Sequence, residues 1–282
     1  MRLRLPREVV ERAAAYASGE RVAVAPKDAA TVVLLREGSV APELYLLHRQ
    51  PTMSFAAGMA VFPGGGVDDS DFGVSEWFGP TPEQWALRLD AAPGLAAALV
   101  VAAVRETFEE SGVLLAGTGP ESVVGDVSGA DWEVDRLALV AKEQTFGEFL
   151  TRRGLRIRTD LLGVWSGWQT PAFESRRFRT VFFVAALPAG QVTRDVSTEA
   201  ASVRWLPAEQ ACTLAESREV MMMPPTYATC VEVADYDSIS AVLAAAQGRV
   251  VSMFTPAVVR LPDGSHTMSA PEALADLLAA RS

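Results

Sequence analysis

The sequence contains very few of the residues on which several classes of protein depend. Its 282 residues include only two cysteines and two histidines. Cys212 and Cys230 are too few and too far apart for a disulfide framework or a zinc site, and they indicate a reducing compartment. With only His48 and His266, a histidine-rich metal site is impossible and a Ser-His-Asp triad is unpersuasive. Carboxylate chemistry remains as the main catalytic resource.

Positive charge and long apolar runs are also scarce. The formal net charge is −10 and the sequence pI is about 4.8, which argues against a nucleic-acid partner because such proteins usually carry a basic stripe. The apolar run at 95–104 is well short of the roughly twenty residues that span a bilayer, so no membrane partner is expected. The first twenty residues lack a secretory apolar core, and the final Ala-Arg-Ser is not a peroxisomal address. We therefore expect a cytoplasmic location.

The most informative feature is a group of three glutamates at the end of an alanine-rich apolar run. Residues 105–112 read Arg-Glu-Thr-Phe-Glu-Glu-Ser-Gly, so Glu106, Glu109 and Glu110 share one face of a helix. Like charges at this spacing repel each other by a few tenths of a kcal/mol per pair, which favours a bound cation. A hard divalent ion such as Mg²⁺ suits oxygen ligands and keeps positions open for phosphate oxygens. The alternative is a solvated glutamate face.

An upstream glycine turn favours the cation-binding interpretation. Residues 59–62 form a short apolar stretch that runs into Pro63 and then Gly64, Gly65 and Gly66. Consecutive glycines permit unusual backbone angles and let the chain approach a ligand closely. A strand, a glycine turn and a helix of carboxylates could together hold a metal-bound pyrophosphate.

These residues resemble the box of the Nudix hydrolases, which ends in Arg-Glu-(apolar)-x-Glu-Glu-x-Gly-(apolar). The second half of the box matches, with Thr107 at the first apolar place: Arg105, Glu106, Glu109, Glu110, Gly112 and Val113. The first half departs, because about twenty-six residues are inserted between Gly65 and Arg105 relative to an uninterrupted box. Counting back from Arg105, the usual box glutamate and glycine fall at Ala97 and Ala91. Four acidic residues in the insertion could replace that glutamate, which in the family braces the loop: Asp68, Asp69, Asp71 and Glu76.

The interrupted box resembles the branch that includes the peroxisomal coenzyme A diphosphatases, whose sequences share a Phe-Pro-Gly-Gly stretch. Further agreement extends over roughly residues 29–227 and includes Leu46-Leu47-His48-Arg49, Met53-Ser54-Phe55, Thr170-Pro171, Arg176-Arg177-Phe178 and Met223-Pro224-Pro225-Thr226. The resemblance implies a metal-dependent hydrolase that cleaves the pyrophosphate of a nucleoside diphosphate linked to another group, with coenzyme A or acyl-CoA as the leading substrate. One alternative keeps the pyrophosphatase but takes ADP-ribose, a dinucleotide or a nucleoside triphosphate. The other is a nucleotide-binding regulatory module with weak or no catalysis.

The resemblance also implies roles for individual residues. The cofactor would be Mg²⁺ or Mn²⁺, held by Glu106, Glu109, Glu110 and, as an additional ligand, Glu199. Glu106 or Glu199 could instead be the general base, and Arg105 would brace the loop through a salt bridge. The substrate would contact the glycine turn Gly64, Gly65 and Gly66 and, because guanidinium binds phosphate in a bidentate manner, Arg49, Arg176 and Arg177. An ordinary surface position is the alternative for Glu199 and for each of these three arginines.

The implied fold is an α/β class, Nudix-type α/β/α sandwich with a mixed β-sheet, a helical insertion in the box and a C-terminal extension. We expect an N-terminal helical segment at 1–28, the hydrolase domain at 29–227 with the insertion at about 67–94, and the packed extension at 228–282. Within the insertion, Thr81 and Gln84 predict a capping box at the start of a helix that runs to about Asp90. Gly112 predicts the end of the carboxylate helix, which we expect to begin at about Leu95.

Other elements follow from hydrophobic periodicity and turn residues. Helices are expected at 8–17, 207–217 and 236–247, and strands at 30–35, 44–48, 59–62, 179–187 and 201–206. Besides a small nucleotide-type substrate, the sequence leaves a homodimer open.

Overall fold

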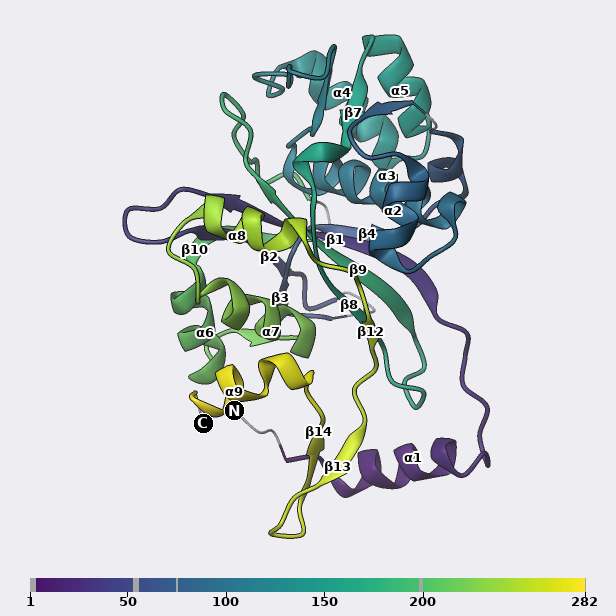
Figure 1. Cartoon of the computed structure of the whole chain (residues 1–282), viewed down its shortest axis with the longest axis vertical. Helices are drawn as coiled ribbons and strands as arrows, with labels where there is room; N and C mark the ends of the chain where they lie inside the picture. Colours follow the sequence, from purple (N-terminus) through teal and green to yellow (C-terminus); the bar gives the residue numbers. More distant parts are fainter. Residues whose placement is uncertain (1–3, 53–55, 75, 198–199, 282) are drawn as a thin grey trace.

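A mixed β-sheet runs through the centre of the molecule (Figure 1). The computed structural model describes residues 4–52, 56–74, 76–197 and 200–281. Within these ranges the sheet comprises β1 (Lys27–Arg36), β2 (Glu43–Arg49), β3 (Met59–Val61), β4 (Gly64–Gly66), β8 (Gly163–Gln169), β9 (Phe178–Ala186), β10 (Ala200–Pro207), β11 (Met221–Met222) and β12 (Met253–Phe254). The five strands expected from the sequence are all present, with ends shifted by a few residues.

The pairing around β1 determines where the glycine turn lies. β1 runs parallel to β9 from the pair Lys27 and Phe178 to the pair Leu35 and Ala186, and it runs antiparallel to β2. The glycines themselves form β4, which pairs antiparallel with β1 so that Gly66 lies opposite Ala29. The glycine segment is therefore fixed in the sheet beside the start of its central strand.

Helices cover both faces of the sheet. One face is covered by α2 (Pro82–Leu89), α3 (Pro93–Ser111), α4 (Ala130–Val140) and α5 (Phe146–Arg153), and the other by α6 (Ala208–Glu216), α7 (Pro224–Val233) and α8 (Ile239–Gln247) (Figure 1). Alternate residues of β1 enter two separate cores, as the two-residue period of a strand requires. Val32 and Leu34 pack with α3, whereas Val33 and Leu35 pack with the second helical layer. The expected α/β/α sandwich is confirmed.

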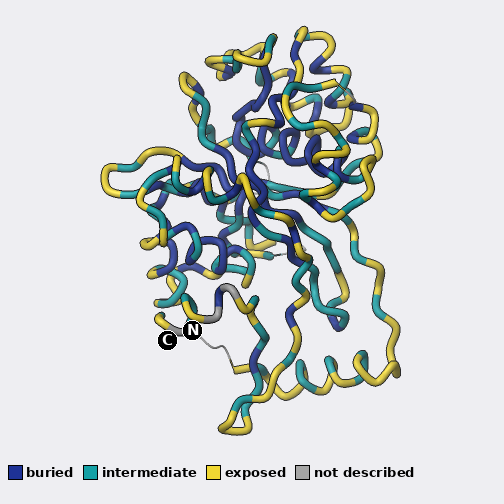
Figure 2. Tube along the Cα trace, in the orientation of Figure 1, coloured by how far each residue is buried: buried dark blue, intermediate teal, exposed yellow. Residues whose placement is uncertain are grey.

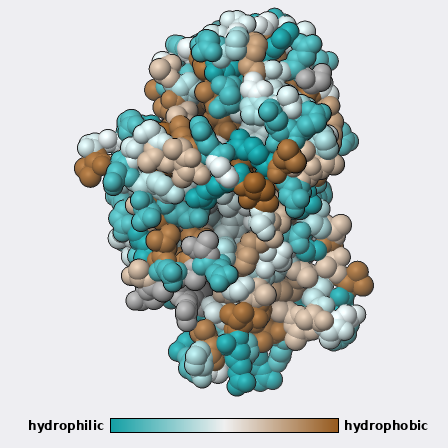
Figure 3. All heavy atoms as spheres, in the orientation of Figure 1, coloured by the Kyte–Doolittle hydropathy of each residue, from teal (hydrophilic) through white to brown (hydrophobic). Residues whose placement is uncertain are grey.

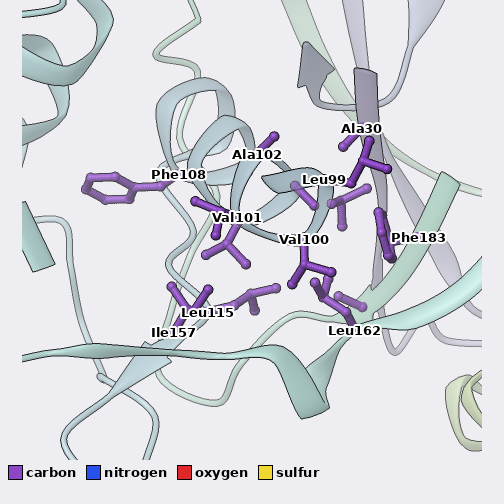
Figure 4. Packing of buried hydrophobic residues seen from close by; sticks show 14 of the residues in the cluster. Ala30, Leu99, Val100, Val101, Ala102, Phe108, Leu115, Ile157, Leu162 and Phe183 are labelled. Atoms are coloured by element: carbon purple, nitrogen blue, oxygen red, sulfur yellow. The ribbon is translucent and has the colours of Figure 1, made fainter. Parts of the chain in front are cut away.

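α3 is buried around most of its circumference, which explains the long apolar run. Its residues 98–104 are all buried (Figure 2). Figure 4 shows Leu99 and Val100 directed toward β1 and β9, whereas Val101 lies toward Leu115 and Ile157. The helix ends at Gly112 in a left-handed conformation, with φ of 72°, as the sequence predicts. It begins at Pro93 rather than Leu95, because proline at the first helical position loses no hydrogen bond.

The insertion is folded rather than a loose loop. It contains the 3₁₀ turn η1 (Asp69–Gly73), β5 (Trp77–Phe78) and α2, and β5 joins a small sheet with β7 (Arg156–Arg158) and β6 (Ala116–Gly117). The predicted capping box of Thr81 and Gln84 is present at the start of α2. Trp85 of α2 is fully buried and meets the ring of Phe183 edge-on. The insertion is thus anchored in the main core.

The first and the last described segments of the chain meet below the sheet (Figure 1). α1 (Arg7–Ala17) has no buried residue, and the amide of Leu5 donates to the carbonyl of His266 in a hairpin formed by β13 (Val258–Arg260) and β14 (His266–Met268). α9 (Glu272–Ala279) follows this hairpin. α7 crosses the expected boundary at 227 and 228, and both β12 and α8 pack within the sandwich. The part of α7 beyond 227, α8 and β12 therefore belong to the sandwich, whereas β13 and β14 form a separate two-stranded sheet.

Two remaining features of the surface concern possible partners. No single described helix is long and apolar enough to cross a membrane. Among the described helices, α2 and α3 taken together reach the required length and apolar composition, but the chain bends by 90° between them. On the face drawn in Figure 3, described apolar residues lie in small groups between hydrophilic ones. The homodimer stays a prediction.

Candidate active site

Arg105 lies at the centre of the site, near the C-terminal end of α3. Its Nε and Nη2 atoms donate to the two carboxylate oxygens of Asp71, each at 2.8 Å, and Nη2 also donates to the carbonyl of Gly66 at 3.0 Å. Asp71 has no exposed surface, so this is a buried bidentate ion pair. Of the four acidic candidates for the missing box glutamate, Asp71 is the one that pairs with Arg105.

A short turn positions Asp71. The backbone amide of Asp68 donates to Asp71 at 2.8 Å, while the Asp68 side chain accepts from the amide of Ser70 at 3.0 Å. Together they form a capping box at the start of η1. From the end of α4, Lys142 binds the other side of Asp68, with Nζ 2.6 Å from Oδ2. This bond with Lys142 and the two bonds from Ser70 hold the pKa of Asp68 well below its usual range.

The three glutamates surround the same arginine. Glu106 accepts from Arg105 Nη1 at 2.8 Å and Glu109 accepts from the same nitrogen at 3.4 Å, whereas Glu110 accepts from the amide of Gly64 at 2.8 Å. Burial raises the pKa of Glu106 to about 7 and raises the pKa of Glu109, and Arg105 offsets these effects only in part. Burial therefore disfavours the ionised form of both carboxylates in the absence of a bound cation.

Because Gly64 and Gly65 have no side chains, their backbone can lie close to the carboxylates of α3. A Cβ atom added at Gly65 would lie 2.4 Å from Glu106 Oε1, closer than real contacts allow. Gly64 is equally confined, because its added Cβ would lie 2.4 Å from the carbonyl oxygen of Ala30. A side chain at Gly65 would displace the Glu106 carboxylate, whereas one at Gly64 would push β4 away from β1.

Gly65→Ala should therefore displace the Glu106 carboxylate. We expect kcat to fall by about tenfold to a hundredfold, since a misplacement on the order of 1 Å has effects of that size, and stability to fall by about 1 to 3 kcal/mol from overpacking. Gly73→Ala is the matched control, because a Cβ atom there meets nothing within 4 Å. Steady-state kinetics and thermal melts of both variants test this, and equal effects of the two would contradict it.

A pocket of about 940 Å³ opens beside the cluster. Seven of the sequence-predicted site residues line it: Gly66, Arg105, Glu106, Glu109, Glu110, Arg176 and Arg177. Arg177 is bonded to protein, since its Nη1 and Nε donate to the carbonyls of Val24 and Thr170 at 2.7 Å and 3.1 Å. Arg49 lies at the end of β2 and does not line this pocket. Glu199 lies outside the described residues.

Several residues of the site were not anticipated. Lys27, Arg136 and Lys142 also line the pocket. Arg136 is almost fully buried and donates to the carbonyl of Glu109 at 2.7 Å, which places a cation at the C-terminal end of α3. The buried Gln191 side chain bonds both the amide and the carbonyl of Leu114, just after α3. Two sequence signals were available: the acidic first turn of α4, which contains the Glu133 partner of Arg136, and the Asp68-x-x-Asp71 spacing of the capping box.

The acidic side chains at the pocket have the chemistry of ligands for a divalent cation. Within the described parts of the chain, no three acidic, histidine or cysteine side chains already form a closed ligand set, because Glu106 and Glu109 face Arg105 and Glu110 faces Gly64. The chemistry nevertheless fits, since three carboxylates line one pocket and two of them have a raised pKa that a bound cation would relieve. Small rotations of these side chains would present their oxygens to the pocket.

Comparison with known proteins agrees with this geometry. The family model described as the NUDT19 Nudix domain matches residues 82–232, more than half of the chain. The chain belongs to this family of Nudix hydrolases. Such enzymes generally use divalent metal ions and act on small nucleotide-type substrates.

Individual relatives are moderately similar. A Xenopus laevis protein named acyl-coenzyme A diphosphatase NUDT19 is 27% identical over 227 residues, which are 66% of this chain and 58% of that one. The human protein of the same name is 27% identical over 235 residues, which are 70% of this chain and 62% of that one. The chain thus spans about three-fifths of these relatives. The solved structure of a NUDIX hydrolase from Alicyclobacillus acidocaldarius matches with a TM-score of 0.69 and 27% sequence identity. The match covers 78% of this chain and 96% of that protein's chain.

Proposed function

We propose that this chain is a diphosphatase that uses water and Mg²⁺ or Mn²⁺ to cleave the pyrophosphate of coenzyme A or of an acyl-CoA. The observation that carries the proposal is the pocket lined by Glu106, Glu109 and Glu110 and also by exposed cations. The similarity to proteins named acyl-coenzyme A diphosphatase supports the choice of substrate. ADP-ribose, dinucleotides and nucleoside triphosphates are the competing substrates.

The residues of the site have different proposed roles in hydrolysis. Glu106, Glu109 and Glu110 would hold the metal ion, which supplies Lewis acidity and lowers the pKa of water. The alternative role for Glu106 is the general base, in which case Glu109 and Glu110 would hold the metal ion without it. Arg105 keeps these carboxylates in place through Asp71 rather than by touching substrate. Glu199 is retained as a proposed further ligand or alternative base.

Phosphate recognition is assigned to cations and backbone around the pocket. Arg176 is proposed to contact a phosphate, whereas Arg177 fixes the neighbouring chain through its bonds to two carbonyls. Arg49, which lies outside the pocket lining, is retained only as a contact for substrate that extends beyond it. Gly66 gives the pocket a wall of bare backbone.

The test is hydrolysis of a substrate panel by the purified protein with Mg²⁺ or Mn²⁺. The panel holds coenzyme A, acetyl-CoA, ADP-ribose, NADH, diadenosine polyphosphates and nucleoside triphosphates. We expect coenzyme A to yield 3′,5′-ADP and phosphopantetheine, chelation to abolish the reaction, and Glu109→Gln and Glu110→Gln each to reduce it by about a hundredfold. Glu143→Gln, a change at an exposed residue outside the pocket, is the control and should be neutral.

Other outcomes point elsewhere. Faster turnover of ADP-ribose or a dinucleotide would replace the substrate while keeping the hydrolase. Nucleotide binding that persists in both glutamine variants, with no turnover of any compound, would identify a regulatory binding module instead.

A further inference from the structure

The helix α4 contacts both parts of the interrupted box. One part is the turn η1 with Asp68 before it, and the other is the end of α3 that carries the glutamates. From α4, Arg136 donates to the carbonyl of Glu109 at 2.7 Å. Lys142, two residues after the end of α4, places Nζ 2.6 Å from Asp68 Oδ2. One short segment therefore joins two parts of the site that the insertion separates along the chain.

The contact with α3 fixes its last turn from outside the helix. Arg136 is 2% exposed, and its Nε and Nη2 atoms donate to the two carboxylate oxygens of Glu133 at 2.9 Å and 2.6 Å. Glu133 also accepts from Arg194 Nη1 at 2.8 Å, and the amide of Arg194 donates to the carbonyl of Ser111 at 2.9 Å. The last carbonyls of a helix have no partner within it. Here those of Glu109 and Ser111 are bound by this network.

The contact with the turn uses a lysine in an unusual backbone conformation. Lys142 has a φ of 56°, in the left-handed region, and its amide donates to the carbonyl of Leu139 where α4 ends. Glycine is the usual residue at such a place, because a side chain is sterically unfavourable there. The Lys142 side chain is 79% exposed, so its ion pair with Asp68 adds little stability. Stability therefore does not explain why this position has a side chain, whereas the contact with Asp68 does.

We propose that Arg136 and Lys142 are positioning residues for hydrolysis, and that α4 with Lys142 forms a clamp, the α4 clamp, between the two parts of the box. Lys142 holds Asp68, whose amide in turn holds Asp71. Arg136 holds the turn of α3 that carries Glu109. Because the insertion parts the turn from the helix along the chain, a third element sets their separation. The proposal rests on the proposed hydrolase but not on the choice of substrate.

Lys142→Gly should lower activity without lowering stability. We expect kcat for the fastest substrate of the panel to fall by about tenfold, because the carboxylates lose their fixed separation from the turn. The melting temperature should stay constant or rise, because glycine adopts the left-handed conformation without steric cost. Lys142→Arg should recover most of the lost activity. Asp90→Gly is the matched control, since Asp90 is also exposed and left-handed, with a φ of 47°, but ends α2. It should keep the kcat of wild type.

Binding of Mn²⁺ to the full chain, measured by isothermal titration calorimetry, separates positioning from charge. Removing a positive charge near carboxylates would by itself strengthen the binding of a cation. The α4 clamp predicts the opposite, a several-fold weaker binding of Mn²⁺ in Lys142→Gly and no change in Asp90→Gly.

Replacing Arg136 tests the other contact of the α4 clamp. Arg136→Met keeps a long side chain at this buried position but removes its hydrogen-bond donors, so kcat should fall by about a hundredfold. Arg136→Lys keeps the charge and should recover part of this loss. If Arg136→Met does not fold, Lys142→Gly decides, because its stability is not expected to fall.

Three results would overturn the α4 clamp. The first is a Lys142→Gly variant with the kcat and the Mn²⁺ affinity of wild type. The second is a rise in KM for the substrate alone, which would make Lys142 a substrate contact. The third is an equal loss of activity in Asp90→Gly. Failure of the proposed function is a separate observation, because wild type would then hydrolyse no compound, whereas the Mn²⁺ titration would still judge the clamp.

Discussion

Asp71→Asn should lower the free energy of unfolding by about 3 to 5 kcal/mol, the cost of leaving one member of a buried ion pair without its partner. Asp71 has no exposed surface and accepts two hydrogen bonds from Arg105, and it also accepts the amide of Asp68. The asparagine keeps the size of the side chain but removes its charge. Urea denaturation, with the slope of the transition compared with wild type, measures the effect.

Asp69→Asn is the matched control for this change. Asp69 belongs to the same turn but is exposed, so its replacement should alter stability by less than about 0.5 kcal/mol. If the two variants were equally stable, the turn rather than the Arg105 ion pair would be holding the loop. Activity should fall in Asp71→Asn alone, because Arg105 would then be free to pull Glu106 and Glu109 out of position.

Glu106→Gln should reduce the rate of hydrolysis by about a thousandfold, within the range that general bases and charged ligands contribute. The same change should make the metal-free protein more stable above pH 7. Burial raises the pKa of Glu106 from 4.5 to about 7, so the folded protein must ionise this buried carboxylate as the pH rises. Glutamine removes that cost.

The sign of the pH dependence follows from linkage. A folded pKa above the unfolded value adds stability that is complete below pH 4.5 and is lost as the pH rises through about 7. For Glu106 this loss is at most about 3 kcal/mol. Melting temperatures at pH 5 and pH 8 in chelator should fall more for wild type than for Glu106→Gln, and Mg²⁺ should restore wild type at pH 8. A parallel decline in both proteins would contradict the assignment.

Local sequence rules predicted the elements that carry strong local signals. The start of α2 followed from Thr81 and Gln84, and the end of α3 followed from Gly112, because caps depend on residues only a few positions apart. α4 and α5 were not predicted. α5 buries Phe146, Phe149 and Leu150 and begins with a capping box of Thr145 and Glu148, a local signal that was missed. The buried face of α4 instead contains the charged residues Asp135 and Arg136, so hydrophobic periodicity alone did not reveal it. Tertiary ion pairs compensate there for the missing apolar contacts.

For the site, the sequence predicted which residues gather but not which contacts they make. A salt bridge of Arg105 was expected and Arg105 pairs with Asp71, yet the choice of Asp71 among four acids depended on the 3₁₀ turn. Arg177 was predicted to bind phosphate but donates to two backbone carbonyls. The sequence does not distinguish these two roles of an arginine.

The interruption of the box also makes the chain unusually tolerant of added length at one place. Arg105 and Asp71 are 34 positions apart, yet the turn that carries Asp71 is closed by its own capping box before the rest of the insertion begins. Each doubling of a flexible loop costs only about 0.6 kcal/mol of closure entropy. A reporter domain or an affinity tag grafted at exposed Ala92, between α2 and α3, would extend the chain without separating the two ends of the ion pair.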